Sequence, residues 1–254
     1  MTEATFEVRN LRKSFGTQVA VNDLSLKVPR GSIYGLVGPN GSGKTTMISM
    51  ATGLLRPDAG TASICGFDIW EQGMEAKQRF GLLADGMPVF DRLTGREFLE
   101  YLGSLRRMPP EVTQQRATEL LAALGLTPAA DKQIVDYSAG MTKKILLASA
   151  LLHNPPLLIL DEPLEAVDPA SAQVIQQILR RYVAAGGTVL LSSHVMELVE
   201  GLCDHVAIIK DGQVLRQGHV AEVRGDSTLT QVFVQLVGGG DLAAEALGWL
   251  KSDD

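Results

Sequence analysis

The chain has 254 residues, a length that fits one large domain or one domain with an inserted subdomain. Its hydrophobic content of 45% and charged content of 20% are ordinary for a globular protein with a core. The net charge of -6 disfavours a broad nucleic-acid-binding surface, which is usually basic, so we expect no nucleic-acid partner. A local basic site for a single nucleotide is still compatible with this charge.

No segment predicts a secretion signal or a membrane span. The N-terminus, MTEATFEVRN, lacks a charged region followed by an apolar one, and apolar runs such as ILLASALL (145–152) are too short to cross a bilayer. We therefore expect a cytosolic protein, or one attached to a membrane through other proteins. Cys65 and Cys203 have no metal-ligand or disulfide spacing, and we expect two small buried hydrophobes in a reducing compartment.

The first third of the chain predicts strands around one helix. FEV (6–8) and LSLKV (24–28) alternate like half-buried strands, and SIYGLV (32–37) reads as a mostly apolar strand. TTMISMATGLL (45–55) has helical spacing, and FGLLA (80–84) reads as another core strand.

The segment 94–152 then reads as almost wholly helical. Thr94 and Glu97 have the spacing of a capping box, and Ser138 precedes the last helical run. This pattern predicts an α/β core interrupted by a helical insert at about 86–155.

Strand signals return in the last third of the chain. They lie at LLILD (157–161), TVLLSS (188–193) and HVAIIK (205–210). Asp168 and Pro169 form a good cap and first position for the helix between the first two of these strands. We expect the domain to cover 1–225, followed by a weakly patterned tail at 226–254.

A phosphate-binding loop is the clearest chemical motif. The strand SIYGLV runs into GPNGSGKTT (38–46) and then into a helix, which matches G-x-x-x-x-G-K-[ST] in its required context. Glycines at 38, 41 and 43 permit a tight turn that aims backbone N–H groups inward, toward an anion at the N-terminus of the helix. Lys44 supplies a charge for the β- and γ-phosphates, and Thr45 supplies a hydroxyl for Mg²⁺. We therefore predict an ATP site with Mg²⁺.

Two carboxylates end the most hydrophobic strand of the chain. Burial of an unpartnered carboxylate is costly, but Asp161 beside the phosphate loop has a partner if it holds Mg²⁺, which prefers hard oxygen ligands. Glu162 lies one residue further on, where it is placed to orient and deprotonate a water for in-line attack on the γ-phosphate.

At this point the chain resembles the nucleotide-binding subunits of ABC transporters, over about residues 5–225. The resemblance rests on five motifs in order: GPNGSGKT, YSAGM (137–141), LLILDEP, AVDP (166–169) and SSH (192–194). It implies a Mg-dependent ATPase with an α/β, P-loop NTPase (RecA-like) core, an antiparallel β subdomain and an inserted helical signature subdomain. The chain looks most like exporter-type subunits for drugs, lipids or polymers.

The resemblance also implies roles for individual residues. His194 would contact the γ-phosphate, Phe15 would stack on adenine, and Ser138 with Gly140 would face the ATP held by the opposite subunit of a head-to-tail dimer. The nucleotide-binding set would further comprise Gly38, Pro39, Asn40, Gly41, Ser42, Gly43, Lys44, Thr45 and Thr46. Phe15 is equally compatible with core packing, and Ser138 with an ordinary helix cap.

Three positions depart from the family pattern. Asp85 occupies the place of the usual glutamine that contacts the metal, where we expect it near the γ-phosphate as a minor metal ligand. Ala139 replaces a usual glycine of the signature, and LEAV (164–167) replaces a more usual Thr-x-Gly-Leu.

The resemblance implies a separate permease as partner. The segment DGMPVFDRL (85–93) offers Met87, Val89, Phe90 and Leu93 for a cytoplasmic helix of such a permease, or else these side chains pack inward. We therefore expect a transporter ATPase at the cytoplasmic face of a membrane, paired with a second copy or a related ATPase subunit. A soluble ABC ATPase for iron–sulfur assembly or nucleic-acid handling is the alternative.

Overall fold

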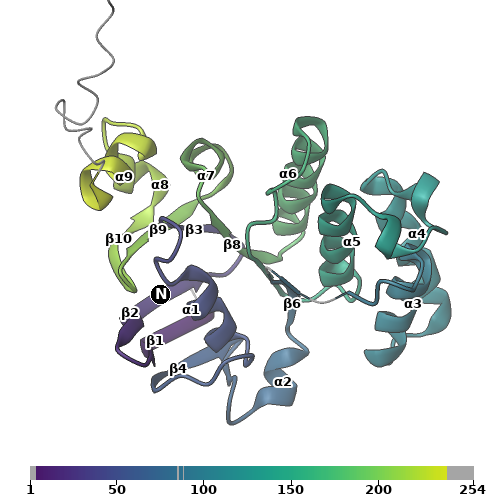
Figure 1. Cartoon of the computed structure of the whole chain (residues 1–254), viewed down its shortest axis with the longest axis horizontal. Helices are drawn as coiled ribbons and strands as arrows, with labels where there is room; N and C mark the ends of the chain where they lie inside the picture. Colours follow the sequence, from purple (N-terminus) through teal and green to yellow (C-terminus); the bar gives the residue numbers. More distant parts are fainter. Residues whose placement is uncertain (1–3, 85, 88, 239–254) are drawn as a thin grey trace, which may run out of the picture.

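The computed structural model describes residues 4–84, 86–87 and 89–238 of the chain. These residues form a six-stranded sheet, a four-stranded sheet and helices around both (Figure 1). No helix within the described residues is long and apolar enough to cross a membrane.

The six-stranded sheet contains every core strand that the sequence predicted. Its order is β10-β9-β3-β8-β7-β6, and it is parallel except for the β9–β10 hairpin. The strands are β3 (Ile33–Val37), β6 (Phe80–Leu83), β7 (Leu157–Leu160), β8 (Thr188–Ser193), β9 (His205–Lys210) and β10 (Gln213–His219). Because β3, β7 and β8 are parallel, the residues after their C-terminal ends meet at one edge of the sheet.

The four-stranded sheet is antiparallel, with the order β2-β1-β4-β5. It comprises β1 (Ala4–Phe15), β2 (Gln18–Pro29), β4 (Ala59–Ile64) and β5 (Phe67–Asp68). The predicted strands at 6–8 and 24–28 were placed correctly but were too short, because shifts in register between β1 and β2 break the simple alternation. Strands β4 and β5 were missed because AGTASI and FD carry almost no hydrophobic pattern.

The helices begin at most of the capping residues that the sequence predicted. They are α1 (Lys44–Ala51), α2 (Gly73–Lys77), α3 (Gly95–Leu105), α4 (Pro110–Ala123), α5 (Ala139–Leu151), α6 (Pro169–Ala184), α7 (Met196–Leu202), α8 (Val220–Arg224) and α9 (Leu229–Val237). The capping box of Thr94 and Glu97 is present, and Ser138 and Asp168 cap α5 and α6.

Two helical predictions need correction. Helix α1 ends at Ala51 rather than at residue 55, because Gly53 adopts a left-handed φ of 76° that ends the helix. The weakly patterned tail contains α9, which has a capping box of Thr228 and Gln231. This helix was not predicted because it is short and follows a weakly patterned segment.

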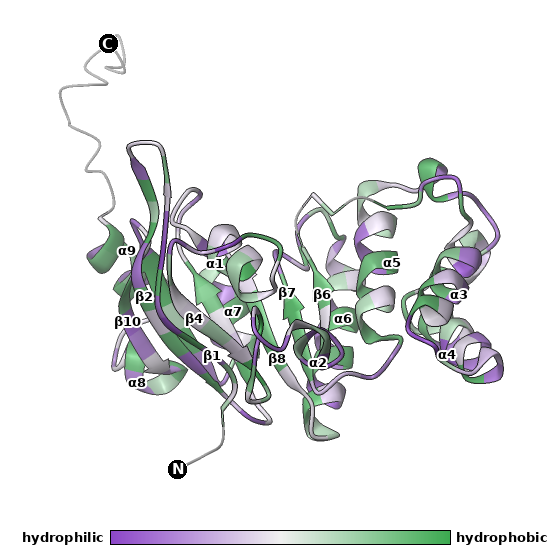
Figure 2. Cartoon of the chain, turned by 90° about the horizontal axis from the view of Figure 1, so that it is seen from below, coloured by the Kyte–Doolittle hydropathy of each residue, from purple (hydrophilic) through white to green (hydrophobic). Residues whose placement is uncertain are grey.

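Separate hydrophobic clusters cover the two faces of the six-stranded sheet. Leu157 and Ile159 of β7 pack toward the four-stranded sheet and α1, whereas Leu158 and Leu160 pack toward the helices on the other face. All four side chains are buried, as the continuous apolar run predicted, and Figure 2 shows β7 as a hydrophobic strand. Cys203 is buried as expected, but Cys65 is only half-buried.

Helices α3, α4 and α5 follow β6 and precede β7, and α3 and α4 lie at the end of the molecule away from the four-stranded sheet (Figures 1 and 2). The boundaries at 1–225, about 86–155 and 226–254 stay predictions.

A half-buried histidine links this helical region to the sheet and gives a prediction about acid stability. The ring of His153 contacts the Phe80 carbonyl at 3.2 Å, and burial together with the charge of Arg106 lowers the pKa of His153 to about 4. Between pH 6.5 and 4 the unfolded chain therefore binds a proton that the folded chain excludes, so stability falls as the pH falls.

We expect this histidine to lower the free energy of unfolding by roughly 3 kcal/mol across that range. His153→Gln should remove this part of the loss, as measured by urea unfolding at pH 7 and pH 4.5. Equal pH dependence in the variant and the parent would contradict the prediction.

Candidate active site

The phosphate loop connects β3 to α1, and two of its glycines are required by close packing. A Cβ on Gly38 would lie 2.4 Å from the Ile209 carbonyl oxygen, and one on Gly43 would lie 2.4 Å from that of Ala20. Gly43 and Gly41 also have left-handed φ values of 101° and 80°. Neighbouring strands therefore hold the loop in shape.

Lys44 is the first residue of α1, and its side chain reaches back to this loop. Its Nζ donates hydrogen bonds to the carbonyl oxygens of Gly38 at 2.7 Å and Pro39 at 3.2 Å, and the residue is only 7% exposed. Burial lowers the pKa of the Lys44 ammonium, while the carboxylates of Glu162 and Asp161 oppose that shift. The cation is thus fixed beside two acids, in a position from which it can reach an anion bound by the loop.

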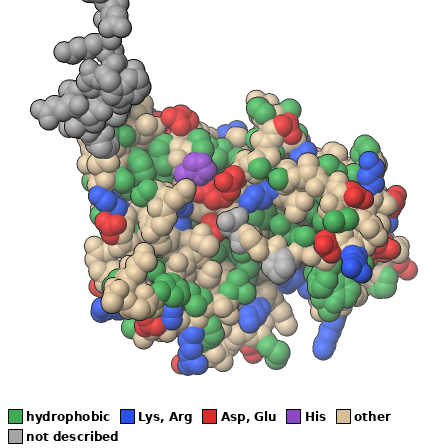
Figure 3. Space-filling view, viewed as in Figure 1, with side chains coloured by type: hydrophobic (Ala, Val, Ile, Leu, Met, Phe, Trp, Pro, Cys, Tyr) green, Lys and Arg blue, Asp and Glu red, His purple; other side chains and the backbone are tan. Residues whose placement is uncertain are grey.

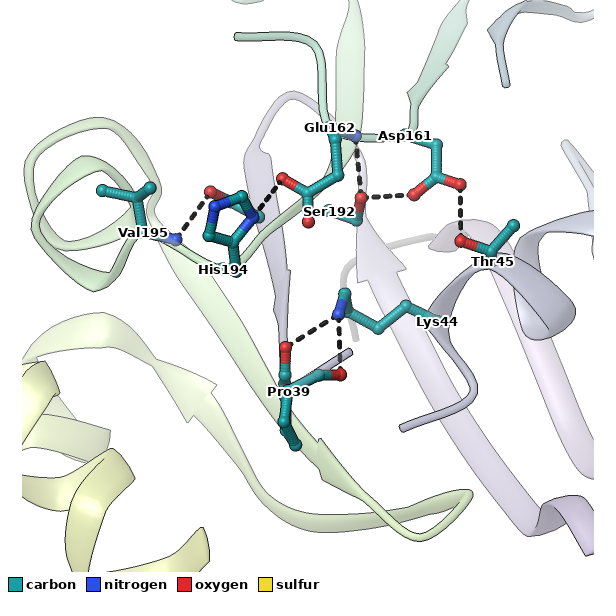
Figure 4. A network of polar contacts seen from close by, with 10 residues as sticks. Pro39, Lys44, Thr45, Asp161, Glu162, Ser192, His194 and Val195 are labelled. Atoms are coloured by element: carbon teal, nitrogen blue, oxygen red, sulfur yellow. Dashed lines mark hydrogen bonds and ion pairs between the residues drawn. The ribbon is translucent and has the colours of Figure 1, made fainter. Parts of the chain in front are cut away.

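Asp161 is fully buried, and two hydroxyl groups satisfy its carboxylate (Figure 4). Thr45 Oγ1 donates to Asp161 Oδ2 at 2.8 Å, and Ser192 Oγ donates to Asp161 Oδ1. Ser192 also accepts a hydrogen bond from the backbone N–H of Glu162 at 2.9 Å. Ser192 therefore holds the Asp161 carboxylate and the Glu162 backbone together, a role not expected from the sequence, although the SSH motif contains this residue.

Glu162 and His194 form the second half of the polar network. His194 Nδ1 lies 3.1 Å from Glu162 Oε2, and the two side chains are 51% and 16% exposed (Figure 4). Glu162 has a left-handed φ of 48°, which is uncommon for a residue with a side chain and is concentrated at functional sites. This backbone conformation places Glu162 beside His194 rather than beside Asp161.

These groups border an open cleft of about 570 Å³. The described residues that line it are Phe15, Gln18, Ala20, Asn40, Gly41, Ser42, Gly43, Lys44, Thr45, Thr46, Glu162, Glu165 and His194. Most of the predicted nucleotide-binding residues therefore share one cleft, and Phe15, 51% exposed, is not a core residue. The face drawn in Figure 3 shows a histidine beside acidic side chains at the surface. Gln18, Ala20 and Glu165 were not predicted as site residues because no motif marks them.

A second groove of similar size, about 530 Å³, lies between β1 and β2 on one side and β9 and β10 on the other. Its cations Arg9 and Lys27 both form ion pairs with Glu7. Glu7 offsets only one of these two positive charges, but this groove has no phosphate loop or helix N-terminus. The glycine-rich cleft has both, together with Lys44, and is therefore the better candidate for an anionic substrate.

The structure places Ser138 and Gly140 apart from this cleft, since neither residue lines it. Ser138 is exposed at the start of α5 and accepts a hydrogen bond from Met141 N at 3.3 Å. A Cβ on Gly140 would lie 2.9 Å from the Ala166 carbonyl oxygen, so α5 begins against the AVDP segment. Asp85, the remaining predicted site residue, lies outside the described residues.

Comparison with known proteins assigns the family. The profile of the family described as ABC transporter matches residues 21–165. The chain belongs to the ABC transporter family. It is therefore an ATP-binding cassette ATPase, and the predicted family and α/β P-loop NTPase fold are confirmed.

Three relatives of this ABC transporter ATPase indicate its branch of the family. It is 34% identical to the linearmycin resistance ATP-binding protein of Bacillus subtilis, a match that covers 94% of the chain and 78% of that protein. It is 38% identical to a Nod factor export ATP-binding protein of Burkholderia lata, with 86% and 72% covered. It is 33% identical to a daunorubicin resistance ATP-binding protein of Streptomyces coeruleorubidus, with 96% and 77% covered.

Solved structures share the ABC ATPase fold. An ATP-binding subunit of an ABC transporter superposes with a TM-score of 0.85 at 27% identity, covering 91% of this chain and 99% of that one. A dimeric, post-hydrolysis ATP-binding cassette bound to ADP and phosphate gives a TM-score of 0.77 at 25% identity, covering 84% and 98%.

Proposed function

We propose that this chain is the ATP-hydrolysing subunit of a membrane exporter, which drives a separate permease through ATP-dependent head-to-tail dimerisation. The observation that carries the proposal is the convergence of Lys44, Thr45, Glu162 and His194 on one cleft, with the buried Asp161 carboxylate hydrogen-bonded to Thr45. The relatives are named for linearmycin resistance, daunorubicin resistance and Nod factor export, which supports transport outward. In this role the protein lies at the cytoplasmic face of a membrane, held there by its permease.

The residues present fit a magnesium ion. Thr45 Oγ1 and Asp161 Oδ2 lie 2.8 Å apart and are both hard oxygen donors, the type that Mg²⁺ takes from proteins while phosphate and water complete its coordination. These two residues would hold the ion, which neutralises phosphate charge when bound. Asp85 as a further ligand stays a prediction.

The side chains of this cleft have complementary roles in hydrolysis. The loop N–H groups and Lys44 bind the phosphates, and Glu162 accepts the proton of the attacking water at its carboxylate. His194 fixes that carboxylate through the 3.1 Å contact and contacts the γ-phosphate. Phe15, exposed at the mouth of the cleft and approached by Lys13 Nζ at 5.8 Å from the ring centroid, stacks on the adenine.

The dimer supplies the part of the site that one chain lacks. The exposed Ser138 hydroxyl and the N-terminus of α5, with Gly140 in its first turn, form an anion-binding helix end that does not line the cleft of the same chain. A second copy, or a related subunit, presents this end to the γ-phosphate. The site is therefore complete only between two subunits.

A patch beside the helical region is suited to the permease. Phe90 and Tyr101 are 51% and 41% exposed and form an edge-to-face contact at 5.2 Å, and Met87 is also exposed. Val89 and Leu93 instead pack against the core, so the two alternatives for segment 85–93 apply to different residues. We propose that a cytoplasmic helix of the permease covers the exposed aromatic pair.

Co-purification from detergent-solubilised membranes tests this proposal. The tagged parent should recover a multispanning membrane protein, and Phe90→Glu should reduce its recovery roughly tenfold, since a buried unpaired charge opposes binding. Leu215→Glu is the matched control, because Leu215 is an exposed apolar residue on β10, the edge strand of the six-stranded sheet at the other end from β6. Recovery of soluble partners alone would favour the soluble ABC ATPase, and equal recovery with Phe90→Glu would exclude the patch as the contact.

A further inference from the structure

Helix α7 begins directly behind His194. His194 and Val195 connect β8 to α7, and Val195 occupies the N-cap position of the helix without a side-chain capping bond. The helix packs against β3 so closely that a Cβ on Gly35 would lie 2.6 Å from Val199 Cγ1. The backbone of His194 therefore lies between the end of β8 and the start of α7.

The C-terminal helix α9 is fastened to α7 by side chains of α7 itself. Glu200 Oε2 accepts a hydrogen bond from the backbone N–H of Leu229 at 2.9 Å, at the N-terminus of α9. Glu197 Oε1, one turn nearer to His194, accepts from Thr230 Oγ1 at 3.0 Å. A carboxylate at a helix N-terminus is favourable both as an acceptor and as a charge facing the helix dipole.

The rest of α9 is anchored to the same body. Leu229 is fully buried, and Val232 is almost fully buried in the hydrophobic cluster that also contains Val199. At the other end, Lys210 Nζ donates to the Val237 carbonyl oxygen at 2.8 Å, which ties the C-terminus of α9 to β9. Helix α9 is thus fixed at both ends and at its buried face.

We propose that α9 positions His194 through α7, with Glu200 and Glu197 as positioning residues for ATP hydrolysis. The proposal rests on the role of His194 in the proposed function. His194 is half exposed, and its described side-chain contact is the one with Glu162, so the backbone at the start of α7 carries the ring. A catalytic group that is displaced by about 1 Å can lose on the order of 10² in rate.

Glu200→Ala is the principal test. It leaves the Leu229 N–H without its acceptor, and we expect kcat for ATP hydrolysis to fall roughly tenfold. The KM for ATP and the affinity for nucleotide should stay within about twofold, because the phosphate loop is untouched. Glu200→Gln should restore kcat because its carbonyl oxygen still accepts. Glu119→Ala, which removes an exposed pair with Gln115 within α4, is the matched control and should change nothing.

A double-mutant cycle of Glu200→Ala and His194→Ala separates an effect on the position of His194 from a general loss of stability. In the His194→Ala background, Glu200→Ala should cause no further fall in kcat, because the group it positions is gone. If His194→Ala alone leaves kcat unchanged, the proposed role of His194 is wrong. If His194→Ala lowers kcat but Glu200→Ala does not, or lowers it equally in both backgrounds, the inference about α9 is wrong.

A second pair covers the case in which Glu200→Ala fails to fold. Thr230→Val removes the hydroxyl donor to Glu197 with little change in shape, whereas Thr230→Ser keeps it. Loss of kcat in the valine variant with recovery in the serine variant supports the proposal, and equal kcat in both contradicts it.

Histidine ring NMR gives a direct readout, since the chain has only 4 histidines. The signal that disappears in His194→Ala should shift in Thr230→Val and keep its parent position in Thr230→Ser.

Discussion

Glu162→Gln should trap a dimer of this chain with ATP in both sites. Glutamine keeps the size of the side chain and can still bind a water, but it cannot accept a proton. Loss of a general base costs on the order of 10²–10⁴ in rate. Binding by Lys44, Thr45 and Ser138 should survive, because none of these residues depends on that proton. The closed dimer should therefore accumulate when MgATP is present.

Size-exclusion chromatography of Glu162→Gln with and without MgATP measures this effect. The double variant Glu162→Gln with Ser138→Arg is the control, since Ser138 is exposed and caps α5 in the proposed interface. Arginine there should block dimerisation while the monomer stays folded. A single variant that remains monomeric with saturating MgATP, or a double variant that still dimerises, would exclude a homodimeric sandwich and point to a partner subunit.

Lys44→Ala should weaken MgATP binding roughly ten- to hundredfold and abolish turnover. The Lys44 ammonium is buried in the phosphate loop beside Asp161 and Glu162, and a charge-assisted hydrogen bond to phosphate is worth about 1.5–3 kcal/mol. Without the Lys44 ammonium, the negative charges of Asp161 and Glu162 repel the phosphates more strongly.

Titration with a fluorescent ATP analogue, followed by an ATPase assay, checks the Lys44→Ala result. Lys77→Ala, which changes an exposed lysine on α2, is the control and should match the parent in both. Circular dichroism establishes that the alanine variant is folded. Parent-like affinity and turnover in a folded Lys44→Ala protein would contradict the assignment of the loop.

The phosphate loop could be predicted from sequence because its chemistry is local. Nine consecutive residues, from the end of β3 into the first turn of α1, hold the glycines, Lys44 and Thr45, and their main interactions with one another span few positions. Helix caps such as Thr94 with Glu97 are equally local, since one side chain bonds a backbone group three residues away. The apolar run at 157–160 predicted a strand buried on both faces for the same reason.

Other features depend on pairings between distant segments, which no local pattern encodes. Ser192 connects Asp161 and the Glu162 backbone only because β7 and β8 are parallel neighbours in register. Strand β4 forms because β1 offers an edge to pair with, and β5 pairs in turn with β4, despite the weak hydrophobic pattern of both strands.

The sequence also could not predict which side chains would be exposed on the folded surface. Phe90 is half exposed while Leu93, three residues later, packs on the core, and the sequence alone left both alternatives open. Helix α9 owes its position to Glu200 and Lys210, which are distant from it in the chain. By itself the sequence determined which chemical groups this ATPase possesses, because local backbone geometry and hydrogen bonding follow from neighbouring residues. The tertiary structure decided which of those groups meet, because contacts across sheets and between helices depend on how the whole core packs.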